Sequence, residues 1–168
     1  MGAAQCGRRS LSLIIICVAS AIFYAFYSAW HLLLLGCMLT VNWLLAKHVT
    51  KNRYLILGIC INLGVLLLFK YSAFIAWQFG IGSSALPAWL LTLPLAISFY
   101  TFHQISFLVD VSRGKVKRPD ILTYTTYILL FPQLIAGPIV RYSEIGGQLR
   151  RRMPIFVEHR LFRIGFIF

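Results

Sequence analysis

Acidic residues are scarce in this chain of 168 residues. Four carboxylates face sixteen Lys and Arg, which gives a formal net charge of +12. Proton pumping needs a buried carboxylate relay, and this chain has too few acids to supply one. The sequence also contains no paired carboxylates for general acid–base work, no Ser/His/Asp set and no phosphate-binding glycine loop. The four acids are Asp110, Asp120, Glu144 and Glu158.

Charged residues of either sign are also few. They make up 12% of the chain, whereas soluble domains carry about a quarter. Hydrophobic residues make up 60%, and the mean hydropathy is +0.81. A chain so apolar has more core than a soluble domain of its size encloses, which leaves a lipid bilayer as its solvent. The basic residues stand in short blocks between apolar runs, as juxtamembrane anchors do, so we expect no nucleic-acid partner.

Close cysteine pairs are absent. None of the four cysteines stands in a C-x-x-C spacing, and three of them lie within apolar runs. Neither a zinc site nor a disulfide framework is indicated, so we predict no metal site. Packing as small apolar side chains is the favoured interpretation. The four are Cys6, Cys17, Cys37 and Cys60.

Long apolar segments are what the sequence does contain. Spanning a bilayer takes about 20 apolar residues, and fewer where the bilayer is thin. The segments predict an all-α fold of polytopic transmembrane helices, in which 1–168 forms a single membrane domain. We expect Tyr71–Ser84 to be a loop or an interfacial segment. The five segments are Leu11–Tyr27, His31–Ala46, Tyr54–Phe69, Ala85–Val109 and Ile121–Val140.

The distribution of Lys and Arg predicts the orientation. With the N-terminus in the cytoplasm and four segments crossing, the blocks at Arg8-Arg9, Lys47–Arg53 and Arg113–Arg118 all fall inside. Only Lys70 then lies at the outer end. A multi-pass protein with a cytoplasmic N-terminus is therefore expected.

The fifth segment is interrupted by Pro132, Gly137 and Pro138. A full crossing would place the richest arginine block, from Arg141 onward, outside the cell. A re-entrant segment, broken by the prolines and the glycine, removes this conflict. Such irregular backbone is tolerated only inside protein or beside a water-filled hollow, so we predict a polar cavity at membrane depth. The alternative is a kinked full span with the arginines outside.

Polar residues within the fourth segment are candidates for a site. Phe99, His103, Ser106 and Asp110 share one helix face. Polar groups inside a span usually face protein or water, so His103 and Gln104 are expected to point inward. His103 either lines a cavity and contacts substrate, or is a neutral histidine bonded to a neighbouring helix. Asp110 lies near the expected cytoplasmic end of the segment, close to Arg113, where an ion pair would be wet and weak.

Further candidates lie in and after the fifth segment. Gln133 either bonds the carbonyls freed around Pro132 and Pro138, or faces a ligand. Arg141 either neutralises a phosphate or a pantetheine-bearing donor, or anchors the chain at the membrane surface. Asn42 and Asn62 are expected to bond between helices.

Two stretches resemble the membrane-bound O-acyltransferase (MBOAT) family, and within it the bacterial alginate O-acetyltransferases. They are Leu93–Gly114, which contains Ser-Phe-Tyr-Thr-Phe-His-Gln-Ile-Ser, and Tyr127–Tyr142, which contains Phe-Pro-Gln-Leu-Ile-Ala-Gly-Pro-Ile. The second run is quite specific, because proline and glycine rarely fall at such spacing inside an apolar segment. The resemblance extends from about Arg9 to Arg152.

This resemblance implies a partial MBOAT fold, in which tilted helices ring a thinned centre. Cavity or substrate-lining residues would be His103, Gln104, Pro132, Gln133, Gly137, Pro138 and Arg141. An acyl donor such as acetyl-CoA or another acyl carrier would be engaged from the cytoplasm, with no cofactor held permanently. The acceptor would be an exported polysaccharide, reached with partner acetylation proteins.

The family's catalytic histidine lies on a later helix, and His103 is not at its position. The resemblance therefore implies the N-terminal part of a longer acyltransferase, inactive alone, in a bacterial inner membrane. It would help transfer an acyl group, most simply acetyl, to polysaccharide hydroxyls. A non-catalytic membrane scaffold and a small transporter component are the alternatives, and the scarcity of acids argues against the transporter.

Overall fold

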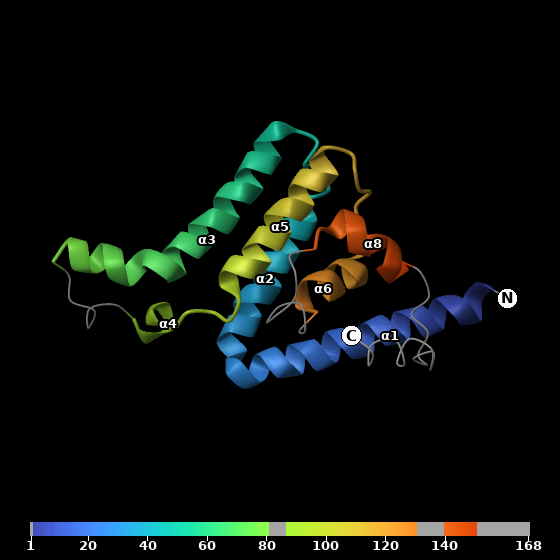
Figure 1. The fold of residues 1–168 in the computed structure, drawn as a ribbon, viewed down its shortest axis with the longest axis horizontal. Coiled ribbons are helices and arrows are strands. Elements are labelled where there is room, and N and C mark those ends of the chain that lie inside the picture. The colour runs from blue at the N-terminus through green and yellow to red at the C-terminus, as the bar shows by residue number, and fades with distance from the viewer. Residues whose placement is uncertain (1, 81–86, 131–139, 151–168) are drawn as a thin grey trace, which may run out of the picture.

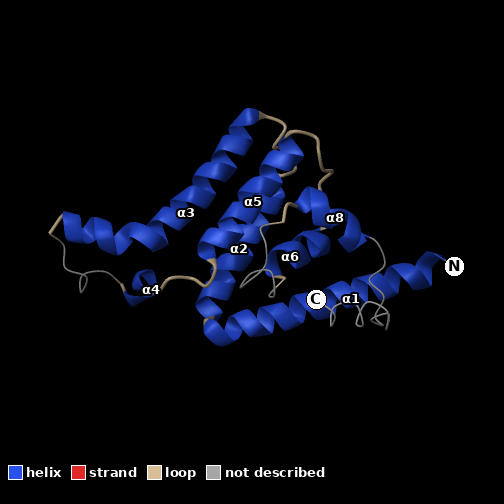
Figure 2. Ribbon diagram, in the orientation of Figure 1, coloured by secondary structure: helices blue, strands red, loops and turns tan. Residues whose placement is uncertain are grey.

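A computed structural model describes residues 2–80, 87–130 and 140–150 of the chain. Within these ranges all regular structure is helical, and Figure 2 shows helices joined by loops. The expected all-α class is confirmed for this part of the chain. The helices are α1 (Gly2–Tyr27), α2 (Ala29–Leu45), α3 (Asn52–Gln78), α4 (Ala88–Leu91), α5 (Ile97–Ser112), α6 (Ile121–Leu129) and α8 (Tyr142–Arg150).

Helices α2, α3 and α5 form the centre of the fold. They contact one another, while α1 passes across one end and packs against α2 and α6 (Figure 1). Helices α2 and α5 both start at the end near α1, and α3 runs the opposite way (Figure 1). The core between these helices is aliphatic and aromatic, with Leu35, Leu39, Phe107 and Leu108 fully or almost fully buried.

Two helix starts are fixed by capping side chains. Ser28 is extended at the tight corner between α1 and α2, and its hydroxyl accepts from the backbone N–H of His31 at 3.4 Å. Asp120 is extended before α6, and its carboxylate accepts from the N–H of Thr123 at 3.0 Å. Each side chain satisfies one of the free N–H groups that every helix start exposes, so both helices begin at defined residues.

The outward faces of α1 and α3 are apolar. Ser10–Tyr27 and Asn52–Gln78 are long and apolar enough to cross a membrane, judged by length and composition, yet fewer than a quarter of the residues in either are buried. Ile15, Ile22 and Ile56 are each more than half exposed. Burial of such side chains is the main gain of folding in water, so this apolar exterior is that of a membrane protein.

Helix α2 matches the expected segment His31–Ala46 to within two residues, but it is short. Its 17 residues reach about 25 Å at 1.5 Å per residue, against a hydrocarbon core of about 30 Å. The full count of four spans therefore stays a prediction.

The fourth expected span, Ala85–Val109, is wrong as one continuous helix. Helix α4 ends at Leu91, and α5 begins only at Ile97. Pro94 stands between them, where it lacks an N–H and disfavours helical backbone at the residue before it. A break in the middle of an apolar run therefore has a local cause, which hydropathy alone does not reveal.

Contacts from α1 hold this break in place. Tyr24 donates to the carbonyl of Leu95 and Tyr27 donates to that of Leu93, both at 2.9 Å. Ala96 then adopts left-handed backbone, with φ of 56°, directly before α5. The two tyrosines satisfy carbonyls that a broken helix leaves free, which lowers the cost of the break inside an apolar segment.

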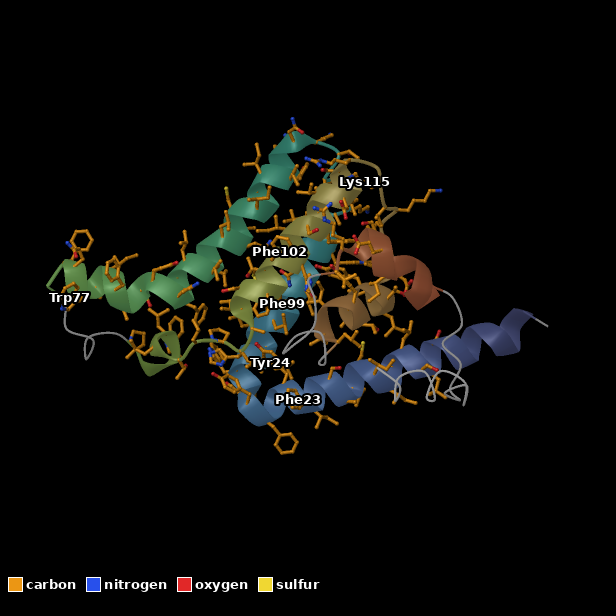
Figure 3. The ribbon with its side chains drawn as sticks, in the orientation of Figure 1. Phe23, Tyr24, Trp77, Phe99, Phe102 and Lys115 are labelled. Carbon is orange, nitrogen blue, oxygen red and sulfur yellow. The ribbon has the colours of Figure 1, made fainter. Side chains whose placement is uncertain are left out.

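Helix α3 is longer than expected. The loop or interfacial segment predicted from Tyr71 to Ser84 is helical as far as Gln78, because no proline or glycine interrupts the run after Phe69. Trp77 lies at the far end of this extension and is 74% exposed (Figure 3). Residues 81–84 of the predicted loop lie outside the described residues.

The expected fifth segment, Ile121–Val140, is helical only at its start. Helix α6 ends at Leu129, ahead of Pro132. The predicted proline-and-glycine break falls in residues 131–139, which lie outside the described residues. Whether this segment spans or re-enters the membrane stays a prediction.

Candidate functional site

Three buried side-chain amides join α2, α3 and α5. Asn62 Nδ2 donates to Asn42 Oδ1 at 2.6 Å, and Asn42 Nδ2 donates to Gln104 Oε1 at 2.7 Å. All three side chains have no exposed surface. The prediction that the two asparagines bond between helices is confirmed, and Gln104 points inward as expected. We name Asn42, Asn62 and Gln104 the amide cluster.

Each asparagine of the amide cluster is also tied to its own helix. Asn42 Nδ2 donates to the carbonyl of Met38 at 2.8 Å, and Asn62 Nδ2 donates to that of Gly58 at 2.7 Å. Gly58 has no side chain between α3 and α5, where an added Cβ would come within 2.5 Å of Leu108. The glycine therefore permits the close approach of helices that short amide side chains need.

His103 is buried one residue before Gln104, between α5 and α6. Its ring centroid lies 4.5 Å from that of Phe99 and 5.4 Å from that of Tyr127. Its Nε2 atom has no hydrogen-bond partner. The inward orientation matches the sequence-based expectation, and at Nε2 there is no bond to a neighbouring helix.

Aromatic rings continue from His103 toward α8. The ring of Tyr127 lies 5.2 Å from that of Tyr142, which in turn lies 5.6 Å from Phe107. Phe107 also packs against Tyr124 at 4.5 Å. The Tyr127 hydroxyl donates to the carbonyl of Val140 at 3.0 Å. These contacts fix the start of α8 against α5 and α6.

Several buried polar atoms along this row have no partner. In water each would be hydrogen-bonded, so leaving it unsatisfied costs about 1–3 kcal/mol. Such groups in a folded protein call for an explanation, and a ligand or a bound water supplies one. With hydroxyl, imidazole and carboxylate groups present, the row offers both donors and acceptors to a polar molecule. We name these atoms the unpartnered row: His103 Nε2, Asp110 Oδ2 and Tyr124 Oη.

Asp110 differs from the expectation. The sequence suggests a wet position beside Arg113, but the Asp110 side chain is only 4% exposed while Arg113 is exposed. Asp110 continues the inward face of His103 and Phe107, whereas Arg113 follows the last residue of α5 and is turned out to the surface. Tyr124 and Tyr142 are not among the residues expected from the sequence. Tyr124 and Tyr127 stand three residues apart on one helix face, which was the available signal.

The structure says less about the other residues that were expected to line a cavity. Arg141 is exposed directly before α8, so its predicted role stays a prediction. Pro132, Gln133, Gly137 and Pro138 lie outside the described residues, so their lining roles stay predictions. Among the residues that the structure describes, no group of three or more His, Cys, Asp and Glu is placed to hold a metal ion.

The chain is similar in sequence to bacterial proteins named as O-acetylases and O-acetyltransferases. The chain is 33% identical over 162 residues to the probable alginate O-acetylase AlgI of Pseudomonas aeruginosa, covering 87% of this chain and 31% of that protein. It is 33% identical over 185 aligned positions to the peptidoglycan O-acetyltransferase of Helicobacter pylori, covering 90% and 35%. The probable alginate O-acetylase AlgI of Pseudomonas putida gives 33% over 162 residues, covering 87% and 33%.

The chain thus spans about a third of the length of the curated relatives it matches. No family model and no solved structure matches it. Its similarity nevertheless runs over most of the chain, to relatives that act on two different polymers by their names. Together with the helical, apolar architecture, this similarity confirms the resemblance of the chain to the membrane-bound O-acyltransferase family.

Proposed function

We propose that this chain is the N-terminal part of a membrane O-acyltransferase that transfers an acetyl group to hydroxyls of an exported polysaccharide. The observation that carries the proposal is the 33% identity, over 87% of the chain, to a protein named as an alginate O-acetylase. The enzyme would lie in a bacterial inner membrane, crossing it several times with its N-terminus in the cytoplasm. Acetyl-CoA or another acyl carrier would supply the acetyl group, and partner acetylation proteins would act with it.

The chemistry of this transfer sets what the protein must provide. The acceptor hydroxyl oxygen forms a bond to the acetyl carbon, the carbon–sulfur bond of the thioester breaks, and the hydroxyl proton passes to the sulfur. A base must take that proton, and histidine is the usual choice. We assign no base among the described residues, since His103 is not at the family's catalytic position. The unpartnered row would instead form part of the wall that holds a polar substrate.

Two features favour a substrate-binding wall over a scaffold that binds no substrate. Polar groups buried in a membrane protein are expensive and usually mark substrate paths. The amide cluster has its main bonds made, and so accounts for stability, whereas the unpartnered row has not. A scaffold that binds no substrate has no need for buried polar atoms without partners.

The test is the acetate content of cell polymers. The gene would be disrupted in its source organism, and ester-linked acetate released by mild alkali would be measured separately from exopolysaccharide and from peptidoglycan. We expect acetate in the exopolysaccharide to fall to the background level and to return on complementation. A fall confined to peptidoglycan would move the acceptor to that polymer. Unchanged acetate in both would reject the acyltransferase and leave the scaffold.

A further inference from the structure

Two loops that are far apart in the sequence meet at one end of the helix bundle. One joins α2 to α3 over residues 46–51, and the other joins α5 to α6 over residues 113–120. Figure 1 shows both loops at the end away from α1, and Figure 3 shows Lys115 projecting there. With the start of α3, these loops carry six exposed cations: Lys47, Lys51, Arg53, Arg113, Lys115 and Lys117.

Arg118 and Trp43 join the two loops into one surface. The Arg118 guanidinium lies 3.5 Å from the centre of the Trp43 ring, and its Nε donates to the Trp43 carbonyl at 3.1 Å. Trp43 Nε1 donates in return to the carbonyl of Pro119, also at 3.1 Å. A stacked guanidinium at a helix C-terminus is favoured both by the ring and by the helix dipole. The cations of the two loops are therefore held at a fixed separation.

The surface keeps its positive charge. Asp120 is the one carboxylate in either loop, and it is engaged as the cap of α6. Its oxygens accept from both the N–H and the hydroxyl of Thr123, at 3.0 and 2.8 Å. A carboxylate held in this way at a helix start stabilises α6, and one carboxylate against six exposed cations leaves this surface with a net positive charge.

The cations border directly on the apolar sides of the helices. Leu44, Ile56 and Leu57 lie within one turn of them and are 53%, 59% and 47% exposed. The Arg53 guanidinium lies 4.9 Å above the ring of Tyr54, at the boundary between the two surfaces. Apolar sides that meet basic and aromatic residues at one level mark the headgroup zone of a bilayer. An anionic group at that level is most simply a phospholipid phosphate.

We propose that the loops at 46–51 and 113–120 form one binding surface for anionic phospholipid headgroups, assembled by the stack of Arg118 on Trp43. This surface goes beyond the proposed acetyl transfer and does not depend on it. Arg118 is a positioning residue here, because it is half-buried against Trp43 and holds the exposed cations of its loop beside those of the other.

Lipid retention on the purified chain tests the proposal. The full chain would be equilibrated in neutral detergent with equimolar phosphatidylglycerol and phosphatidylcholine, and the bound lipids would be counted by native mass spectrometry. We expect phosphatidylglycerol to be retained in clear excess. The triple variant Lys47→Gln, Lys51→Gln, Arg53→Gln should lower its apparent affinity by roughly tenfold or more. High salt should weaken the binding of the unaltered chain.

Two variants separate position from charge. Lys70→Gln removes an exposed cation about 27 Å along α3 from the loops, and it should leave lipid retention unchanged. Arg118→Lys keeps the charge but loses the planar stack, so it should weaken phosphatidylglycerol binding several-fold. Equal retention of the two lipids by the unaltered chain would overturn the proposal, as would an equal effect of Lys70→Gln and the triple variant. Displacement of phosphatidylglycerol by acetyl-CoA would also overturn it, and would assign the surface to a soluble anion.

Discussion

Asn62 donates a hydrogen bond to Asn42 at 2.6 Å, although the two residues lie on separate helices and 20 positions apart. Asn42 in turn donates to Gln104 on a third helix. Neither helix α2 nor α3 carries a charge at this depth, so the amides supply the specific contact between apolar surfaces. Hydrogen bonds between helices in a membrane are worth from a few tenths of a kcal/mol to about 2 kcal/mol.

Replacing Asn62 by Ala should destabilise the chain by about 1–2 kcal/mol, because Asn42 Oδ1 would be left buried without its donor. Unfolding by SDS titration in mixed micelles would measure the change. The double variant of Asn42 and Asn62 to Ala should lose less than the sum of the single losses, since one bond is removed twice. Thr40→Ala is the control, because this exposed hydroxyl bonds only its own helix at Gly36. Additive losses would contradict the coupling.

Gly58→Ala and Gly64→Ala form a matched pair on one helix. A Cβ at Gly58 would come within 2.5 Å of the fully buried Leu108, whereas nothing lies within 4 Å of one at Gly64. We expect Gly58→Ala to destabilise the chain by about 1–3 kcal/mol through overpacking. Gly64→Ala should be neutral or stabilising by up to about 1 kcal/mol, because alanine favours helix. The same SDS titration would measure both, and equal effects would mean that α3 and α5 are not in close contact.

Ala96→Gly should stabilise the chain. Ala96 has left-handed backbone, which costs a residue with a side chain about 1–2 kcal/mol and costs glycine little. Part of the gain is offset by the greater freedom of glycine in the unfolded chain, so we expect about 0.5 kcal/mol or more. Ala73→Gly in the exposed part of α3 is the control and should destabilise by about 1 kcal/mol. Destabilisation by both would place Ala96 in ordinary helical backbone.

Sidedness can be read by labelling single cysteines in a background without the native ones. We expect a membrane-impermeant thiol reagent to reach Lys51→Cys and Lys117→Cys from the cytoplasmic side only, and Lys70→Cys from the opposite side. Arg151→Cys should share the side of Lys117→Cys if the segment after α6 re-enters. Labelling of Lys51→Cys and Lys117→Cys from opposite sides would reject the predicted orientation of α5.

His103→Phe separates packing from chemistry. Phenylalanine preserves the ring contacts with Phe99 and Tyr127, and Nε2 has no partner to lose. Stability by SDS titration should therefore be unchanged or slightly higher, because an unsatisfied polar atom is removed. Acetate transfer in a complemented strain should fall at least several-fold if this atom meets the substrate. Full acetate with unchanged stability would return His103 to a packing role.

The inward position of some polar residues could be predicted, because exposing a polar side chain to lipid costs free energy. A glutamine or histidine within an apolar run is expensive to expose to lipid, so Gln104 and His103 had to face protein. Asn42 and Asn62 were predictable as bonds between helices for the same reason. Their actual partners were not, because a partner depends on which helices meet and at what height.

The break between α4 and α5 shows the limit of local reasoning. Pro94 stands in the sequence, but an apolar run with one proline is equally compatible with a kinked helix. The carbonyls at Leu93 and Leu95 are free to leave the helix only because Tyr24 and Tyr27 bond them from α1. Likewise the spacing within α5 places Asp110 on the face of His103 and Phe107, but it does not reveal that α6 and α8 pack against α5.

By itself the sequence determined that the chain is helical, that its solvent is lipid, and which family it resembles. These follow from composition, from the length of apolar runs and from two motifs, all of which are local. Only the tertiary structure decided that Arg118 stacks on Trp43, that three amides meet, and that a row of polar atoms is left buried without partners. Such contacts join residues 20 to 76 positions apart, and their energies depend on distances that exist only once the helices have packed.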